Sequence, residues 1–230
     1  LAMPDALRPD LTGLKIAVSA GGTREALDPV RYLGNRSSGK QGYALARVAA
    51  ARGAQVTLVA AHTQTLPDPA GVELLHAGSA EELRTVMHKV AAEADIVVMA
   101  AAVADFRPTH RADYKIKKTD HDPDPVELTR NPDILTELVA ARKPGQFIVG
   151  FAAETGDSRA DVLDHARAKL RRKGVDLLVV NAVGDGMAFE VEDNAGWLLS
   201  ANGTEITVPL GSKSALAATL WDNVLPAVRG

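Results

Sequence analysis

The sequence of 230 residues contains no cysteine. This absence excludes disulfide bonds and a protein thiolate nucleophile, so any thiol chemistry has to come from a substrate. A strong net charge is also absent, because 26 lysines and arginines face 29 acidic residues. The resulting charge of −3 provides no basic field for nucleic acid, which is therefore not an expected partner.

Long hydrophobic runs are missing as well. The longest, such as the run that begins at Ile96, is too short to span a bilayer, so we expect no membrane partner. Residues 1–10 lack the basic and apolar regions of a signal peptide. We therefore expect a cytoplasmic enzyme, with residues 1–12 as a linker and residues 13–230 as one domain.

The sequence does contain a regular alternation of short apolar segments and helical segments. The apolar segments predict strands over residues 14–19, 55–60, 95–100, 146–151 and 175–181. The segments between them predict helices over residues 39–52, 79–93, from 131 onward and 157–173. Continuous apolar strands joined by helices predict a doubly wound, Rossmann-like α/β fold, with a mostly parallel sheet and helices on both faces.

Two of the predicted helices carry start signals. Ser79 with Glu82 three residues later matches a capping box. Asn131 followed by Pro132 matches an N-cap residue with proline at the first helical position.

Two segments break the alternation. Residues 104–130 are polar and rich in Asp, Pro and Lys, and a connection of this length is usually functional, so we expect a projecting arm. Near the C-terminus, Asn202-Gly203 predicts a type I′ turn that closes a hairpin over residues 197–208. A last helix is expected after Ser212.

Small residues follow several of the predicted strands. In an open α/β sheet, ligands bind at the carboxyl ends of the strands, and small residues let the backbone approach a ligand. The same residues would also serve simply to pack helices on strands. The candidates are Gly21 and Gly22 after the first strand, Ala101 and Ala102 after the third, and Asn181 after the fifth.

The run from Gly34 to Gly42 resembles a phosphate loop. Gln41 stands where such a loop has the Ser or Thr that holds magnesium, and the run begins about fifteen residues after its strand. It is therefore not a standard P-loop. Ser37, Ser38 and Gly39 nevertheless open a helix whose free N–H groups suit a phosphate. An ordinary capped helix start is the alternative.

Other features favour a nucleotide but not a dinucleotide. The first loop lacks G-x-G-x-x-G, and no acidic residue for a ribose follows the second strand. The basic run around Lys115 and the pair Lys169 and Lys173 on one helix face suit phosphate binding, although a solvated run and a helix C-terminus rich in cations are the alternatives. The six histidines show no metal-ligand spacing, so metal ligands remain unknown at this point.

Taken together, these segments resemble the phosphopantothenoylcysteine synthetase family, the ligase half of the bacterial bifunctional coenzyme A enzyme. The resemblance runs from about Gly13 to Trp221. The opening D-L-T-G-L-K-I is similar to the joint that follows the flavin-dependent decarboxylase in that fusion. The other matching stretches are S-A-G-G-T-R-E-A-L-D-P-V-R, G-N-R-S-S-G-K-Q-G, A-A-V-A-D-F, K-I-K-K, N-P-D-I-L, G-F-A-A-E-T and K-L-R-R-K-G-V-D-L-L-V-V-N.

The resemblance implies a reaction in coenzyme A biosynthesis. A ligase would join 4′-phosphopantothenate to L-cysteine with CTP, through an acyl-cytidylate, and release CMP and pyrophosphate. Mg²⁺ would offset the triphosphate charge. It also implies a homodimer and a native fusion to an N-terminal flavin-dependent decarboxylase. An NAD(P)-dependent reductase and a non-catalytic nucleotide-binding module on the same fold are the alternatives.

The resemblance also implies site residues. Asn35 would hold the acyl intermediate, with Arg31, Asp105 and Lys115 as the other catalytic residues. The substrate would be bound by Ser37, Gly39, Gly42, Ala101, Ala102 and Asn181. The nucleotide would be bound by Gly21, Gly22, Asp105, Lys115, Asn131, Pro132, Asp133, Ile134, Phe151, Lys169 and Lys173.

Overall fold

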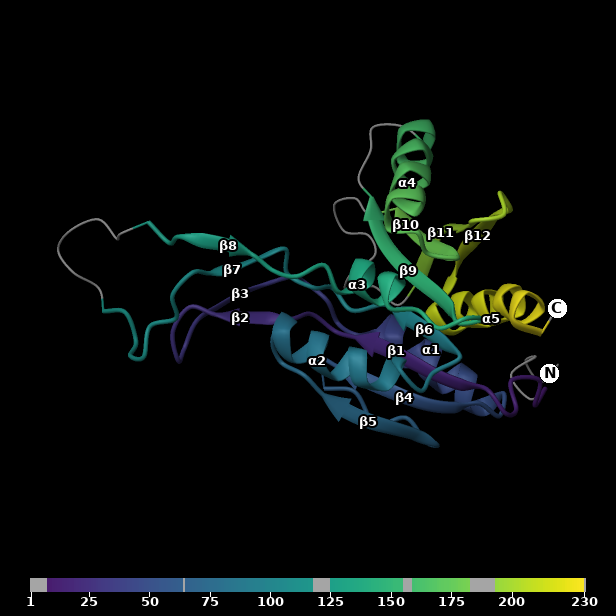
Figure 1. Cartoon of the computed structure of the whole chain (residues 1–230), viewed down its shortest axis with the longest axis horizontal. Coiled ribbons are helices and arrows are strands. Elements are labelled where there is room, and N and C mark those ends of the chain that lie inside the picture. The colour runs from purple at the N-terminus through teal and green to yellow at the C-terminus, as the bar shows by residue number, and fades with distance from the viewer. Residues whose placement is uncertain (1–7, 64, 118–124, 155–158, 183–192, 230) are drawn as a thin grey trace.

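The computed structural model describes residues 8–63, 65–117, 125–154, 159–182 and 193–229. Its centre is an eight-stranded sheet in the order β12-β11-β10-β9-β6-β1-β4-β5 (Figure 1). The six parallel strands are β1 (Lys15–Ala20), β4 (Gln55–Ala60), β5 (Val72–His76), β6 (Ile96–Met99), β9 (Phe147–Glu154) and β10 (Leu177–Ala182). An antiparallel hairpin of β11 (Asp193–Ser200) and β12 (Glu205–Ser212) forms one edge.

Helices cover both faces of this sheet, so the predicted α/β fold is confirmed. One face carries α1 (Lys40–Ala51) and α5 (Lys213–Arg229). The other carries α2 (Ala80–Ala91), α3 (Ile134–Ala140) and α4 (Arg159–Lys173). Alternation along the strands divides the core accordingly, since Ile16 and Val18 join the first cluster and Ala17 joins the second. None of the described helices is long and apolar enough to cross a membrane.

Most predicted elements lie within a few residues of the observed ones, but two local predictions are wrong. The N-cap of α3 is Asp133, whose side chain accepts from Thr136 N, and not Asn131. Asn131 is used elsewhere, because its side chain donates to Ala104 O at 2.8 Å. In the hairpin, Gly203 N donates to Ser200 O, so the turn is centred one residue earlier than the predicted type I′ turn.

Other local predictions agree with the structure. The capping box of Ser79 and Glu82 begins α2. Ser212 Oγ accepts from Ala215 N at the start of α5. Strand β5 was not predicted, because it is a half-exposed edge strand with few buried side chains. At the expected linker, Leu11 is fully buried in the core, while residues 1–7 lie outside the described part.

Two segments project together from the body (Figure 1). One is a hairpin of β2 (Arg24–Ala26) and β3 (Tyr32–Gly34), and the other contains β7 (Phe106–Pro108) and β8 (Leu128–Arg130). Ala112 N donates to Leu27 O at 3.0 Å, which joins them. We call residues 24–34 and 104–130 together the arm. The sequence predicted only its second half, of which residues 118–124 lie outside the described part.

Candidate active site

The loops at the carboxyl ends of β1, β4 and β6 are bound to one another. Gly22 N donates to His62 O at 2.9 Å, and Ala102 N donates to Gly21 O at 2.8 Å. A Cβ atom on Gly21 would lie 2.6 Å from His62 O, and one on Gly22 would lie 2.8 Å from Asn35 O. These glycines therefore allow the loops to approach closely. They do not line either of the two cavities described next.

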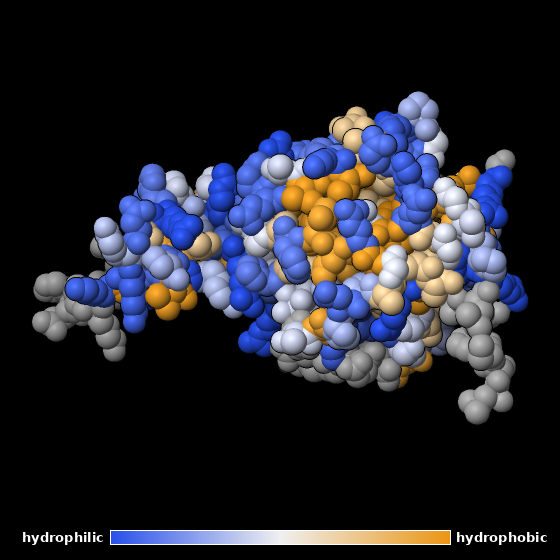
Figure 2. All heavy atoms as spheres, turned by 90° about the horizontal axis from the view of Figure 1, so that it is seen from below, coloured by the Kyte–Doolittle hydropathy of each residue, from blue (hydrophilic) through white to orange (hydrophobic). Residues whose placement is uncertain are grey.

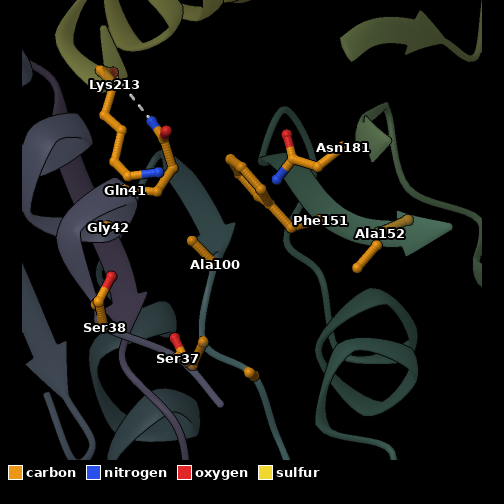
Figure 3. Close-up of a pocket in the computed structure, with 13 residues that line it drawn as sticks. Ser37, Ser38, Gln41, Gly42, Ala100, Phe151, Ala152, Asn181 and Lys213 are labelled. Carbon is orange, nitrogen blue, oxygen red and sulfur yellow. Dashed lines mark hydrogen bonds between the residues drawn. The ribbon is translucent and has the colours of Figure 1, made fainter. Parts of the chain in front are cut away.

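The first cavity lies between these strand ends and the starts of α1 and α5, and has a volume of about 130 Å³ (Figure 3). All six residues predicted to bind the acid substrate line it, which are Ser37, Gly39, Gly42, Ala101, Ala102 and Asn181. Its other lining residues are Ser38, Gln41, Ala100, Phe151, Ala152, Ala153 and Lys213.

Helix α1 begins at this cavity without a side-chain cap. Its N-cap residue is Gly39 in the left-handed conformation (φ 77°), which has no side chain to cap the helix, and Ser38 Oγ accepts from Lys40 N at 3.5 Å. The alternative of an ordinary capped helix start is therefore not what the structure has. The N–H groups of the first turn lack intrahelical partners and lie where an anion would accept from them.

Close packing explains two residues of this loop. A Cβ atom on Gly42 would lie 2.4 Å from Ala20 Cβ, so a glycine is needed for α1 to approach β1. The Gln41 side chain donates to Lys213 O at 3.1 Å, which ties the start of α1 to the start of α5. Gln41 thus has a structural contact at the position where a P-loop holds its metal.

Asn181 brings an unsatisfied acceptor to the first cavity. Its Oδ1 atom is buried, and none of the described residues donates to it. An unpaired buried polar atom costs about 1–3 kcal/mol. A donor on a bound molecule would remove this cost.

The second cavity is larger, about 900 Å³, and opens beside the first. The two share Ala101, Ala102, Phe151 and Ala153. Eight of the residues predicted to bind nucleotide line the second cavity, which are Asp105, Asn131, Pro132, Asp133, Ile134, Phe151, Lys169 and Lys173. Arg36 and Arg130 also line it, although no sequence pattern had pointed to them.

Positive charge predominates in the second cavity. Among the described lining residues, four cations (Arg36, Arg130, Lys169 and Lys173) and two carboxylates (Asp105 and Asp133) give a net charge of +2. Asp133 forms an ion pair with Lys173. Burial would raise the pKa of Asp133, but the Lys173 ammonium and the Thr136 N–H outweigh it and hold that pKa below its ordinary value.

Asn35 lies where the cavities meet. It lines the second cavity, whereas Ser37, two residues later, lines the first. Its Nδ2 atom donates to Val103 O at 3.0 Å, which fixes the amide. Because an amide nitrogen carries two hydrogens, one N–H remains for a ligand.

Besides Gly21 and Gly22, two more predicted site residues do not line the cavities. Arg31 and Lys115 lie on the arm and line neither cavity. Arg31 Nη2 instead donates to Asp28 Oδ2 at 2.7 Å and to Ile116 O at 2.8 Å. Nor do the described residues contain a cluster of three or more potential metal ligands.

Comparison with known proteins gives consistent matches. The chain is 59% identical over 231 residues to the coenzyme A biosynthesis bifunctional protein CoaBC of Mycobacterium bovis, and 44% identical over 212 residues to that of Vibrio cholerae. These matches cover 98% and 91% of the chain but only 55% and 52% of those proteins. The chain thus spans about half the length of the curated relatives it matches.

Solved structures share the fold. The crystal structure of the C-terminal domain of a CoaBC protein is 33% identical, with a TM-score of 0.78 over 95% of this chain and 97% of that one. A Cab2 mutant in complex with phosphopantothenate-cysteine is 19% identical, with a TM-score of 0.73 over 94% and 87% of the two chains. Residues 11–227 also match a family sequence profile. The chain therefore belongs to the family described as the DNA/pantothenate metabolism flavoprotein C-terminal domain.

Proposed function

We propose that this chain is a ligase that joins 4′-phosphopantothenate to L-cysteine with CTP, through an acyl-cytidylate, and releases CMP and pyrophosphate. The observation that carries the proposal is the pair of adjoining cavities. One has an uncapped helix start for a phosphate, the other has net positive charge for a triphosphate, and Asn35 lies between them. The names of the CoaBC relatives and the ligand of the Cab2 complex support it.

In the first step, the substrate carboxylate attacks the α-phosphorus of the nucleotide and pyrophosphate leaves. The protein needs no covalent nucleophile for this step, in accord with the lack of cysteine. Ser37 and Gly39 would hold the substrate phosphate, which directs the carboxylate toward the junction. The cations of the second cavity would hold the triphosphate, so catalysis consists of positioning and charge stabilisation.

In the second step, the cysteine amine attacks the acyl carbonyl and CMP leaves. The remaining N–H of Asn35 would donate to the acyl oxygen, on which negative charge develops. An amide suits this role because it donates without being acylated itself.

We propose CTP as the nucleotide and Mg²⁺ as its metal ion. We infer CTP from the family resemblance. Mg²⁺ is commonly held by one or two carboxylates together with substrate phosphates, and Asp105 and Asp133 line the second cavity, so the donor set fits. Since Asp133 pairs with Lys173, Asp105 is expected to face the metal. Bound Mg²⁺ would offset the charge of the triphosphate.

We also infer a homodimer in which the arm of one subunit completes the site of the other. Of the nine large hydrophobic side chains exposed among the described residues, all except Leu210 lie on the arm. Figure 2 shows hydrophobic atoms on this projection, separate from the larger hydrophobic area on the visible face of the body. Arg31 and Lys115 also lie on the arm, away from both cavities. A two-fold interface would cover the apolar side chains and bring these cations to a partner site.

The remaining proposals concern the whole protein. Because the CoaBC relatives are bifunctional and about twice as long, we infer a native fusion to an N-terminal flavin-dependent decarboxylase. The cytoplasm is the expected location of such an enzyme.

One assay tests the proposed reaction. The protein is incubated with 4′-phosphopantothenate, cysteine and either CTP or ATP, and pyrophosphate and phosphopantothenoylcysteine are measured. Product formation with CTP is expected. Nucleotide binding without product would indicate a binding module, and oxidation of NAD(P)H added in a parallel incubation would indicate a reductase.

A further inference from the structure

Helix α3 forms one wall of the second cavity, although it is only seven residues long. Residues 131–135, at and just before its start, all line that cavity. The helix buries two side chains, Ile134 and Leu138. A helix this short is not stable by itself and depends on contacts with the rest of the fold. The position of this wall therefore depends on the side chains that hold α3.

Glu137 joins α3 to the neighbouring helix α2. Its Oε2 atom accepts from Arg84 Nε at 2.6 Å and lies 3.0 Å from His88 Nε2. Arg84 and His88 are four residues apart on α2, so they lie on the same face of that helix. The Arg84 hydrogen bond outweighs the effect of burial and holds the pKa of Glu137 below its ordinary value, with a smaller contribution from His88. The carboxylate is therefore charged at neutral pH.

The same residue is connected to the start of α3. Glu137 lies one helical turn after Asp133, the N-cap residue, and its N–H donates to Asp133 O at 3.0 Å. Asp133 forms an ion pair with Lys173 of α4, so α3 is held between α2 and α4 (Figure 1). Loss of the Glu137 contact would leave the α4 side in place and let α3 tilt away from α2.

This contact lies behind the wall of the second cavity, since Arg84, His88 and Glu137 line neither cavity. We propose that Glu137 is a positioning residue for the nucleotide, which holds α3 against α2 and so keeps the turn of residues 131–134 in place for binding. The inference rests on the proposed function, because it assigns the nucleotide to the second cavity. The effect should be confined to the nucleotide, because the described lining of the first cavity includes no residue of α3.

Calorimetric titration with CTP and with 4′-phosphopantothenate tests this role. Glu137→Leu removes both contacts with α2 and keeps a residue that favours a helix. It should weaken CTP binding by about two- to thirtyfold, the usual range for a residue that acts through others, and leave 4′-phosphopantothenate binding unchanged. Glu137→Gln keeps an acceptor oxygen and should restore part of the affinity. The matched control is Glu81→Leu, which removes the other carboxylate that accepts from Arg84 but lies on α2, and it should change neither affinity.

A second variant, Arg84→Leu, breaks the same contact without a change in α3. It should also weaken CTP binding, and the double variant should bind CTP no more weakly than Glu137→Leu alone, because both changes remove one interaction. The side chains of Arg84 and Glu137 are 40% and 32% exposed, and pairs this exposed add little to global stability, so both variants should fold. Wild-type CTP affinity in either folded variant, or equal weakening of CTP and 4′-phosphopantothenate, would overturn the positioning role alone. Failure of the wild-type protein to bind CTP would overturn the proposed function as well.

Discussion

Asp28 and Ile116 are 88 residues apart in sequence, yet Asp28 Oδ2 accepts from Ile116 N at 3.2 Å. Asp28 also accepts from Val30 N and from the Arg31 backbone and side chain. Arg31 in turn donates to Ile116 O at 2.8 Å. The buried carboxylate and the guanidinium thus hold both backbone polar groups of Ile116, which joins the two halves of the arm next to Lys115.

Asp28→Asn should loosen the arm. An asparagine keeps one acceptor oxygen, but its NH₂ group would face the donors of Arg31 and Ile116. Hydrogen exchange at Ala112 and Ile116 is expected to accelerate, and the KM for the nucleotide to rise because Lys115 loses its fixed position. Asp113→Asn, an exposed change on the same arm, is the control and should do neither. Unchanged exchange in Asp28→Asn would show that the carboxylate does not hold the arm.

The same carboxylate predicts a pH dependence. Burial would raise the pKa of Asp28, but the N–H groups of Val30 and Ile116 and the Arg31 guanidinium hold that pKa well below its ordinary value. A depressed folded-state pKa contributes stability that is complete above the unfolded pKa of about 3.9 and is lost as the pH falls toward the folded value. In urea unfolding, the stability deficit of Asp28→Asn should therefore be constant at neutral pH and shrink below about pH 4.

Lys115→Ala should raise the KM for the nucleotide far more than the KM for cysteine. A lysine on a phosphate is a charge-assisted contact worth about 1.5–3 kcal/mol, or about ten- to hundredfold in KM. Steady-state kinetics with each substrate varied in turn measures the effect. Lys117→Ala, two residues further along the same segment of the arm, is the matched control. If Lys115→Ala affected all three substrates equally, the lysine would have a structural role.

Asn35→Asp should separate the two half-reactions. Aspartate keeps the size of asparagine but replaces the donor with a negative charge next to a phosphorylated substrate, and loss of one such donor costs about 10²–10³ in rate. Slow formation of acyl-cytidylate and pyrophosphate is expected, without product when cysteine is added. Rapid quench with labelled CTP follows both steps. If Asn35→Asp converted the intermediate at the wild-type rate, Asn35 would have no role in the second step. The control is Asn202→Asp in the hairpin turn, which should behave as wild type.

A mixing experiment tests whether the arm acts on a partner subunit. At a CTP concentration far below the raised KM of Lys115→Ala, the Asn35→Asp and Lys115→Ala proteins should each have little activity alone. After subunit exchange, half of the dimers contain one of each, and each mixed dimer has one site with an intact Asn35 and an intact partner Lys115. Activity should return to roughly a quarter of the wild-type value. No recovery, or a monomer in sedimentation at micromolar concentration with full activity, would mean that each arm serves its own subunit or none.

The amino-acid sequence by itself determined the architecture of the body and predicted many of the residues that line the two cavities. Strand and helix positions follow from local apolar periodicity, which needs no knowledge of distant residues. The carboxyl ends of parallel strands lie at one edge of the sheet, so residues after those strands were expected to meet. Ser37, Gly39, Ala102 and Asn181 do line one cavity, and the Asn131–Ile134 turn lines the other.

Only the tertiary structure decided what depends on contacts between distant segments. The Asn131 side chain donates to Ala104 O instead of capping a helix, because the pairing of β7 with β8 places Asn131 next to Ala104. The first half of the arm, around Asp28, is joined to the second by hydrogen bonds to Ile116, which no local sequence pattern predicts. Lys213 lies 171 residues beyond Gly42 and reaches the first cavity only because α5 packs on α1. Such long-range contacts arise from the packing of whole elements, which local periodicity does not specify.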